Sequence, residues 1–471
     1  MTERLLGPFN RVEGDLEVRL EIADGQIQSA QVVSPLYRGF ETMLPGRAPL
    51  DALVIVPRIC GICSVSQSAA AVTALRQLTG LTPPDNGRLA ECLITAGENV
   101  ADHLTHFYLF FMPDLARPAY AARPWHGRMA ERFEAVKGQG AAEFLAARAA
   151  FMHLQGLMAG KWPHTLTLQP GGSARPLHQA ECLQLTALLR SFRRFLEQRV
   201  YGGPLEAFAA LAAPEELNDW RRRHPGDLSL FLEAAEDLDL ARLGRCDADY
   251  LSFGVYEAPE GRLFPAGVWS GGRLAPLAPE RISEDLSHAW MRSETLPDAD
   301  KPGAYTWCKA PRYGGQVMQT GALARQLVAG QPLLHRLVAE QGGGVLARVL
   351  ARHIEVARLL PEMEAWAARL IPGQPWCAPT PEWPRQGAGV GLTEAARGSL
   401  GHWLEVEEGR IRRYQIIAPT TWNFSPRDEA GVPGALEQAL TGLPVAADDP
   451  MPVNVQHVVR SFDPCMVCTV H

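Results

Sequence analysis

The chain has 471 residues, of which 46% are hydrophobic and 21% are charged, a composition typical of a globular protein with a large core. Its formal net charge of -7 argues against nucleic acid as a partner, because phosphate binding requires a concentrated basic surface. No apolar run approaches the roughly 20 residues that span a bilayer, so we expect no membrane span.

The first predicted elements are two strands near the N-terminus. Hydrophobic residues alternate along residues 16–34 on either side of Asp24-Gly25, which is the pattern of a β-hairpin with a tight turn. Periodicity alone predicts that Glu13, just before this hairpin, is exposed to solvent.

A Cys-x-x-Cys motif, Cys60 to Cys63, follows in a turn and leads into a predicted helix over residues 66–78; a second motif, Cys465 to Cys468, lies just before His471. Thiolates favour zinc, copper(I), nickel and iron–sulfur centres. A structural zinc site is the usual function of two such pairs, but its pairs usually lie within a few tens of residues. Here almost the whole chain separates them. Because loop closure costs little more for long loops, spacing alone leaves a zinc-stapled structural or binding protein open.

The middle of the chain is predicted to be mostly helical. Helical periodicity covers residues 88–112, 141–156, 177–199 and 327–370. Residues 257–279 and 371–387 are rich in Gly and Pro and are predicted to be surface loops, and strands are expected at 404–417 around a turn at Gly409. The predicted fold is α+β, mainly α, with small antiparallel sheets. Since the first and last motifs must meet at one metal, we expect a single intertwined domain over residues 1–471.

Seven short strings, in a fixed order, resemble those of the large, catalytic subunit of [NiFe]-hydrogenases. Two of them surround the cysteine pairs, and the resemblance covers the whole chain. The strings are Arg11-Val12-Glu13-Gly14, Arg38-Gly39-Phe40-Glu41, Arg58-Ile59-Cys60-Gly61-Ile62-Cys63, Asp102-His103 with His106-Phe107-Tyr108, Glu394-Ala395-Ala396-Arg397-Gly398, Ala418-Pro419-Thr420-Thr421-Trp422-Asn423 and Asp463-Pro464-Cys465-Met466-Val467-Cys468-Thr469-Val470-His471. The resemblance implies a hydrogenase large-subunit fold with a helical bundle core, and an enzyme that cleaves H2 heterolytically into protons and electrons.

The resemblance also implies a nickel–iron centre. Cys60, Cys63, Cys465 and Cys468 would bind nickel, and Cys63 and Cys468 would also bridge to an iron that carries CO and cyanide. The protein would then have to control the surroundings of that centre.

Other residues receive roles only through the same resemblance. Arg397 would be a fixed cation over the centre, held by Asp102 and Asp463, although an arginine more often forms a surface ion pair and a lone aspartate a cap. Ala396, beside it, stands where many members have proline. Thr420 would hydrogen-bond a second cyanide.

Two further implied sites lie near the chain ends. Glu13 would relay protons from the Cys465 sulfur. This role requires a position near the metal, whereas periodicity alone predicts that Glu13 is exposed to solvent. Glu41, the carbonyl of Ile416 and His471 match the positions that bind a buried Mg2+ or iron.

Three departures from the commonest pattern suggest a subclass. Gln67 stands where most energy-conserving members have His, Ile62 where Val is usual, and Phe110 where Leu is usual. The larger side chains would narrow the gas path and slow O2 more than H2. All three together resemble the regulatory, H2-sensing hydrogenases, although such exchanges are also common in a drifting core.

This subclass implies slow turnover, O2 tolerance and a cytoplasmic site. The partners it implies are an iron–sulfur small subunit, a histidine kinase and a dimer of heterodimers. An end of the gene at His471 is expected for a sensor, since energy-conserving members are made with a cleaved tail. The alternative is an energy-conserving uptake hydrogenase that feeds a respiratory chain.

Overall fold

The computed structural model describes residues 2–379, 382–446 and 449–471. Helices form most of its regular structure. They are α1 Phe40–Met43, α2 Ala52–Ile55, α3 Ser64–Thr79, α4 Asp85–Thr105, α5 His126–Phe133, α6 Gln139–Ala159, α7 Gln179–Phe195, α8 Leu205–Ala209, α9 Pro214–Arg223, α10 Asp227–Asp237, α11 Ala322–Val328, α12 Pro332–Gln341, α13 Val345–Ala368, α14 Pro419–Asn423, α15 Ala435–Leu440, α16 Val453–Ser461 and α17 Met466–Thr469.

The strands form small sheets, in which most pairs are antiparallel. They are β1 Thr2–Leu6, β2 Glu17–Ala23, β3 Gln26–Val33, β4 Leu168–Gln169, β5 Gly172–Ser173, β6 Asp249–Ser252, β7 Val255–Ala258, β8 Gly261–Phe264, β9 Gly267–Ser270, β10 Arg273–Ala275, β11 Ile282–Asp285, β12 Ala310–Tyr313, β13 Met318–Gln319, β14 Gly387–Ala395, β15 Gly398–Glu407 and β16 Arg410–Ile417. The two three-stranded sheets have the orders β1-β2-β3 and β14-β15-β16.

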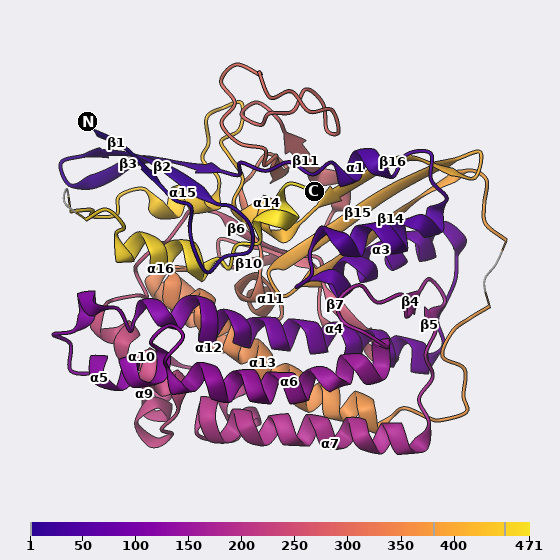
Figure 1. Cartoon of the computed structure of the whole chain (residues 1–471), viewed down its shortest axis with the longest axis horizontal. Coiled ribbons are helices and arrows are strands. Elements are labelled where there is room, and N and C mark those ends of the chain that lie inside the picture. The colour runs from indigo at the N-terminus through magenta and orange to yellow at the C-terminus, as the bar shows by residue number, and fades with distance from the viewer. Residues whose placement is uncertain (1, 380–381, 447–448) are drawn as a thin grey trace.

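Long helices form one layer and the two three-stranded sheets lie above it (Figure 1). Helices α4, α6, α7 and α13 pack on one another. Helix α4 is buried along most of its length, and its polar side chains Glu98, Asn99, Asp102 and His103 contact polar groups inside the protein. The C-terminus ends between the two sheets, close to the start of α3 (Figure 1). This arrangement confirms the predicted α+β fold with a helical core.

Helix α3 lies across the sheet β14-β15-β16 and makes an unusually close contact with β14. A Cβ atom at Gly391 would lie 1.9 Å from the Ala70 carbonyl oxygen, and one at Gly389 would lie 2.1 Å from that of Ala74. The two glycines therefore let the helix backbone approach the strand. Both elements lead into the site, since α3 begins after Cys63 and β14 ends next to Arg397.

Two sequence predictions about elements are wrong. The helix predicted over 327–370 is three helices, α11, α12 and α13, which glycines separate at Gly330 and at residues 342–344. The loop predicted over 257–279 contains β7 to β10, because its glycines mark tight turns between short strands; Gly271 and Gly272 have φ of 53° and 79°. The hairpin at 16–34, the helix at 66–78 and the strands at 404–417 are confirmed.

The predicted helix at 88–112 ends differently from a plain α-helix. Helix α4 stops at Thr105, and His106–Phe111 continue as a π-helical turn. Such turns occur often at functional sites. The loop predicted over 371–387 has no strand or helix in its described part before β14, and residues 380–381 lie outside the described residues.

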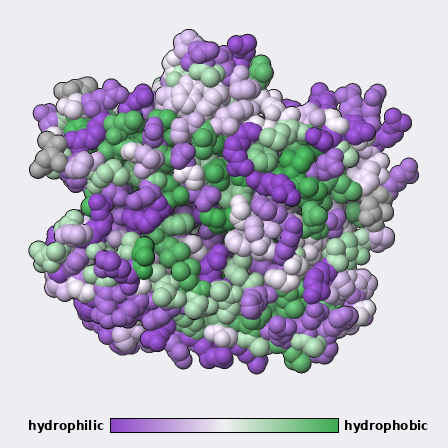
Figure 2. Space-filling model, viewed as in Figure 1, coloured by the Kyte–Doolittle hydropathy of each residue, from purple (hydrophilic) through white to green (hydrophobic). Residues whose placement is uncertain are grey.

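The surface in the view of Figure 2 mixes hydrophilic and hydrophobic residues, and green areas gather where α3 and its sheet lie in Figure 1. Within the described part of the chain, no helix is long and apolar enough to cross a membrane.

Candidate metal centre

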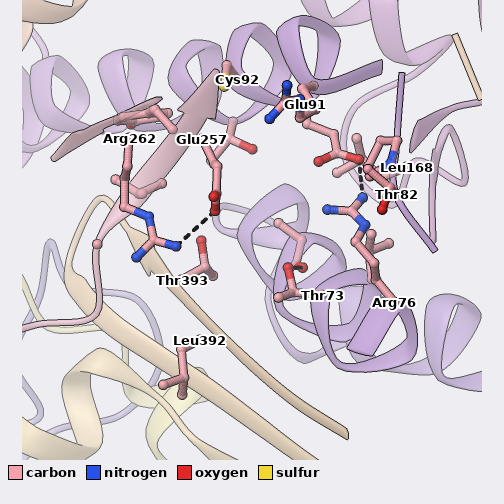
Figure 3. Close-up of a pocket in the computed structure, with 18 of the residues that line it drawn as sticks. Thr73, Arg76, Thr82, Glu91, Cys92, Leu168, Glu257, Arg262, Leu392 and Thr393 are labelled. Carbon is pink, nitrogen blue, oxygen red and sulfur yellow. Dashed lines mark hydrogen bonds and ion pairs between the residues drawn. The ribbon is translucent and has the colours of Figure 1, made fainter. Parts of the chain in front are cut away.

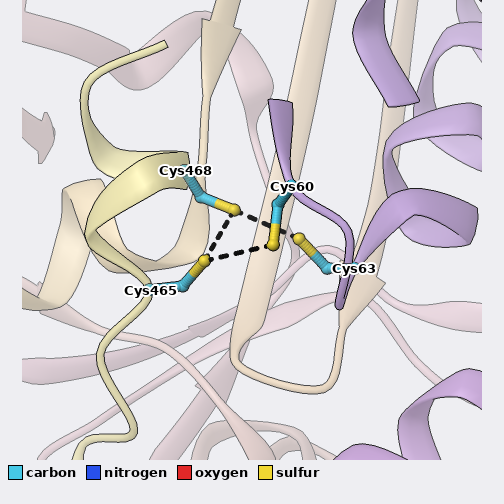
Figure 4. Close-up of side chains that lie close together, drawn as sticks. All are labelled: Cys60, Cys63, Cys465 and Cys468. Carbon is cyan, nitrogen blue, oxygen red and sulfur yellow. Dashed lines mark hydrogen bonds between the residues drawn. The ribbon is translucent and has the colours of Figure 1, made fainter. Parts of the chain in front are cut away.

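The four cysteines of the two motifs meet at one point. Their sulfur atoms all lie within 4.8 Å of one another, and all four residues are buried. The Sγ–Sγ distances are 3.5 Å between Cys60 and Cys465, 3.1 Å between Cys63 and Cys468, and 2.9 Å between Cys465 and Cys468. Figure 4 shows the four side chains pointing toward one another, two from the loop before α3 and two from the C-terminal segment. The structure thus confirms that the motifs converge.

The first cysteine loop is held by two buried or half-buried charges. Glu98 on α4 accepts the backbone N–H groups of Val65 and Ser66, both at 2.9 Å, which fixes the first turn of α3 directly after Cys63. Arg38 donates to the carbonyls of Ile59 and Arg58 in front of Cys60. A carboxylate at a helix N-terminus satisfies N–H groups that have no partner within the helix.

The second cysteine loop is attached to the N-terminal segment. The Met466 N–H donates to the Glu13 carbonyl oxygen at 2.7 Å, and Arg38 Nη1 donates to the Val467 carbonyl at 3.3 Å. Gly14 has a φ of 81°, and a Cβ there would lie 3.0 Å from Val467. Glycine is therefore required for the close approach of the two segments.

The electrostatics favour a cation among the sulfurs. Contacts with the other thiols and burial raise the pKa of Cys63, and burial raises the pKa of Cys468. Hydrogen bonds with the other three thiols lower the pKa of Cys60. Four adjacent thiols cannot all ionise in a buried site without a positive partner. A soft divalent metal supplies that charge, so the donor set fits nickel or another thiophilic ion.

Arg397 lies beside the thiols between two aspartates. Its Nη1 and Nη2 donate to the Asp102 carboxylate at 2.7 and 3.2 Å, and its Nε donates to the Asp463 carbonyl at 3.1 Å. Its Nη2 also lies 3.3 Å from Asp463 Oδ1. Burial raises the pKa of Asp102 to about 8, although Arg397 acts to lower it; for Asp463 burial is outweighed by Arg397 and the pKa falls. The guanidinium is thus held by Asp102 and Asp463, and its role over the metal centre stays a prediction.

Comparison with known proteins agrees with this geometry. A sequence profile described as nickel-dependent hydrogenase matches residues 38–121 and 141–471. The chain belongs to this family. It therefore carries the fold and the H2 chemistry of a hydrogenase large subunit, with a nickel–iron centre at the four cysteines.

Relatives align with this hydrogenase chain from end to end. The periplasmic [NiFeSe] hydrogenase large subunit of Desulfomicrobium baculatum is 29% identical over 99% of this chain and 94% of its own length. The hydrogenase-2 large chain of Escherichia coli (strain K12) is 28% identical over 100% of this chain and 97% of its own length. The Ni-Fe-Se hydrogenase of D. vulgaris Hildenborough in the reduced state superposes with a TM-score of 0.86 at 29% identity, covering 100% of both chains.

Other predicted site residues of the hydrogenase lie next to the cysteine loops. The Cys465 N–H donates to Thr420 Oγ1 at 3.1 Å, so the Thr420 hydroxyl is left to donate elsewhere. Gln67, fully buried one turn into α3, contacts His402 Nε2 through its Oε1 at 2.9 Å. Ala396 is buried in the loop before Arg397.

The two predicted gas-channel residues are half-buried. Ile62 lies inside the first cysteine loop, where its N–H donates to Cys60 Sγ at 3.3 Å. Phe110 lies in the π-helical turn, and its carbonyl accepts from Arg11 at 3.1 Å. Their place in a gas path stays a prediction.

A second buried cluster surrounds the last residue. His471 Nε2 lies 2.6 Å from the Ile416 carbonyl oxygen and 3.6 Å from Glu41 Oε1, while its Nδ1 lies 2.6 Å from the Cys468 carbonyl oxygen. A neutral imidazole has one N–H and can satisfy one of these carbonyls. The predicted residues Glu41, Ile416 and His471 are therefore brought together in a way that calls for an added positive charge.

Sequence reasoning missed Lys309 and Glu284 in this cluster. Lys309 Nζ lies 3.1 Å from Glu41 and 3.0 Å from Glu284. Two carboxylates and one ammonium leave a net charge of about -1, so the cluster can accept a further cation. No local pattern in the sequence marks Lys309, because its partners are distant along the chain.

A cavity of about 340 Å³ opens between α3, α4 and β7, and Cys92 is among the residues that line it (Figure 3). Arg76 pairs there with Glu91, and Arg262 donates to Glu257 at 2.8 Å. Its charged side chains are thus largely paired with one another, and it shares no residue with the metal centre.

Proposed function

We propose that this chain is the H2-cleaving subunit of a regulatory hydrogenase that senses H2 and signals to a histidine kinase. The observation that carries the proposal is the combination of Gln67, Ile62 and Phe110, three positions at which the family resemblance implies that other residues are commoner. Gln67 is buried against His402 next to Cys63, and Ile62 lies within the cysteine loop itself. Both positions can influence what reaches the metal.

A nickel–iron centre supplies a Lewis acid that polarises H2 and takes up its electrons. We infer that the Cys465 sulfur accepts the proton and that Glu13 passes it on, because the backbone of Glu13 is paired with Met466 beside it. Burial, together with the charge of Cys60, raises the pKa of Glu13, which favours a carboxyl group that can both accept and release a proton.

The remaining residues keep this centre oriented. Arg397 is a permanent cation whose spare donors suit cyanide or a bound gas. Thr420 offers a hydroxyl to a second cyanide. We propose CO and cyanide as the iron ligands on the grounds of this donor set and the family resemblance.

We also propose a Mg2+ or iron ion at Glu41, the Ile416 carbonyl and His471. Oxygen donors with one imidazole suit such an ion. Both ring nitrogens of His471 face carbonyl oxygens, and the added positive charge that this arrangement calls for supports the proposal.

The proposed partner is an iron–sulfur small subunit that takes the electrons. Large apolar side chains in the segment that precedes the first cysteine loop are exposed by 38–47%, at Leu36, Met43, Leu50 and Val54. An exposed apolar group of this kind suits a protein interface. A dimer of such heterodimers, docking to the kinase in the cytoplasm, completes the proposed assembly.

An uptake hydrogenase is the second candidate. Its support is the printed name of relatives, such as the uptake hydrogenase large subunit of Azotobacter chroococcum mcd 1, which is 27% identical over 99% of this chain. The two candidates differ in turnover and in sensitivity to O2.

The test is the double variant Ile62→Val with Phe110→Leu, made in the complex with its small subunit. Removing a methylene and most of an aromatic ring opens space in a close-packed region. The free energy of unfolding should fall by about 1–4 kcal/mol. We expect O2 to inactivate the variant during H2 oxidation at least ~10-fold faster than the parent. Phe208→Leu, in the core near α9, is the matched control and should leave O2 tolerance unchanged.

Equal O2 tolerance in the double variant and the parent would remove the physical basis of the sensor proposal. A fast, O2-sensitive parent that does not alter phosphorylation of the kinase in the presence of H2 would favour the uptake enzyme.

A further inference from the structure

The loop that carries Arg397 is a buried hairpin turn. Strands β14 and β15 pair up to Ala395 and Gly398, so Ala396 and Arg397 form a two-residue connection. Such turns usually lie at the surface, where water satisfies their carbonyl groups. Here Ala396 is 2% and Arg397 3% exposed. Their backbone carbonyls therefore need partners inside the protein.

Arg325 on α11 supplies a partner for the Ala396 carbonyl and for the Ala395 carbonyl just before the turn. Its Nη1 donates to the Ala395 carbonyl at 2.8 Å and its Nη2 donates to the Ala396 carbonyl at 2.9 Å. The side chain is fully buried. One guanidinium thus holds two consecutive carbonyls of the segment that leads directly to Arg397.

The rest of the Arg325 guanidinium is fixed by two buried carboxylates. Nε and Nη2 donate to Glu355 at 2.8 and 2.7 Å, and Nη1 donates to Glu394 at 2.7 Å. Together with the two carbonyls, these acceptors match the five N–H donors of an arginine. Every N–H group of Arg325 is therefore bonded, and the guanidinium is held in one orientation.

The two carboxylates are themselves anchored in different elements. Glu355 on α13 also contacts His103 Nε2 at 3.0 Å, next to Asp102 on α4. Glu394 accepts the Phe253 N–H at 2.7 Å and the Ser399 hydroxyl at 2.6 Å. The turn is consequently tied to the helical layer that also carries Asp102, the partner of Arg397.

We propose that Arg325 is a positioning residue for Arg397. It orders the Ala395-Ala396 backbone and thereby sets where the Arg397 guanidinium stands relative to the four sulfurs. The proposal rests on the role proposed for Arg397. Lysine cannot replace Arg325, because an ammonium has three donors and no planar fork that reaches two carbonyls and two carboxylates at once.

The test is a double-mutant cycle with Arg325→Lys and Arg397→Lys in the nickel-loaded complex. If Arg325 acts through Arg397, Arg325→Lys lowers H2 oxidation per nickel at least ~10-fold in the parent and less than ~2-fold in the Arg397→Lys background. A general structural defect lowers both backgrounds by the same factor and would overturn the proposal.

A second readout does not depend on activity. Amide hydrogen exchange of the peptide spanning residues 394–399 reports the order of the turn, in protein with or without metal. We expect exchange there to be at least ~10-fold faster in Arg325→Lys, with nickel content close to that of the parent. Unchanged exchange in this peptide contradicts the proposal.

Arg312→Lys is the matched control. Arg312 is also buried, and it donates to Asp428 and to the carbonyls of Pro311, Pro426 and Val432, none of which belongs to the Arg397 turn. It should lose thermal stability, while exchange at 394–399 and activity per nickel remain those of the parent.

Two outcomes separate the possible failures. If Arg397→Lys alone retains full activity, the role proposed for Arg397 is wrong, and the inference about Arg325 falls with it. If Arg325→Lys does not fold, Glu355→Gln is used in its place, because it weakens the hydrogen bonds that Arg325 donates to Glu355. The double-mutant cycle with Arg397→Lys is then repeated with Glu355→Gln. Equal losses for Glu355→Gln in both backgrounds overturn the positioning role.

Discussion

At the scale of single residues, the chemistry depends on ionisable groups held in unusual surroundings. Glu13 is half-buried beside the second cysteine loop, and burial raises the pKa of its carboxyl. Arg397 is buried between two aspartates. Neither environment can be read from local sequence, since the partners of each residue come from distant parts of the chain.

Glu13→Gln tests the proton relay. An amide keeps the shape of the side chain but cannot accept and release a proton as a carboxylic acid does. We expect nickel content and thermal midpoint near those of the parent, with H2/D+ exchange reduced at least ~100-fold. Glu21→Gln, on the exposed side of β2, is the control. Normal exchange in Glu13→Gln rules out this residue as the relay.

The sequence predicted most of the metal centre, because its ligands lie in short motifs. The four cysteines meet as the motifs predicted, and Arg397 contacts Asp102 and Asp463, while the roles of these three residues at the centre stay predictions. Residues such as Lys309 and Arg325 were missed, since each acts through carboxylates from other elements and has no motif of its own. Periodicity also predicted an exposed Glu13, whereas the structure half-buries it.

At the scale of elements, the contact between α3 and β14 joins the first cysteine loop to the Arg397 turn. Helix α3 was predicted from the sequence, because the segment after the first cysteine loop is rich in Ala and Leu. Strand β14 was not predicted, because its glycines at 387, 389 and 391 interrupt the alternation of side chains. Those glycines are explained only by the approach of the helix backbone, which is a tertiary feature.

Gly391→Ala should break this contact. The new Cβ would lie 1.9 Å from the Ala70 carbonyl, so the helix must move away from the strand. We expect the free energy of unfolding to fall by about 1–3 kcal/mol, which is measured as a lower thermal midpoint. We also expect the protein to retain less nickel. Gly127→Ala in α5 meets no atom within 4 Å and should be neutral or slightly stabilising. A midpoint unchanged in Gly391→Ala would show that the contact is easily displaced.

At the scale of the whole molecule, the two ends of the chain are joined at the centre. The Ile27 N–H donates to the Leu443 carbonyl, and Glu437 accepts the Val32 N–H, so the N-terminal sheet is also paired with the C-terminal region. His471, the last residue, is 3% exposed. We infer that residues 1–471 form one intertwined domain.

This inference predicts that unfolding and nickel release occur together. A metal bound only by the folded chain stabilises it, and here its four ligands come from both ends, so no half of the chain can keep the ion alone. In the nickel-loaded complex, loss of helix by circular dichroism and release of nickel should share one midpoint. Cys468→Ser, in which a hard hydroxyl replaces a thiolate, should contain no nickel and melt at a lower temperature. Nickel that stays bound after a first transition has removed a large share of the helix would instead show two separable units, with the metal held by one of them.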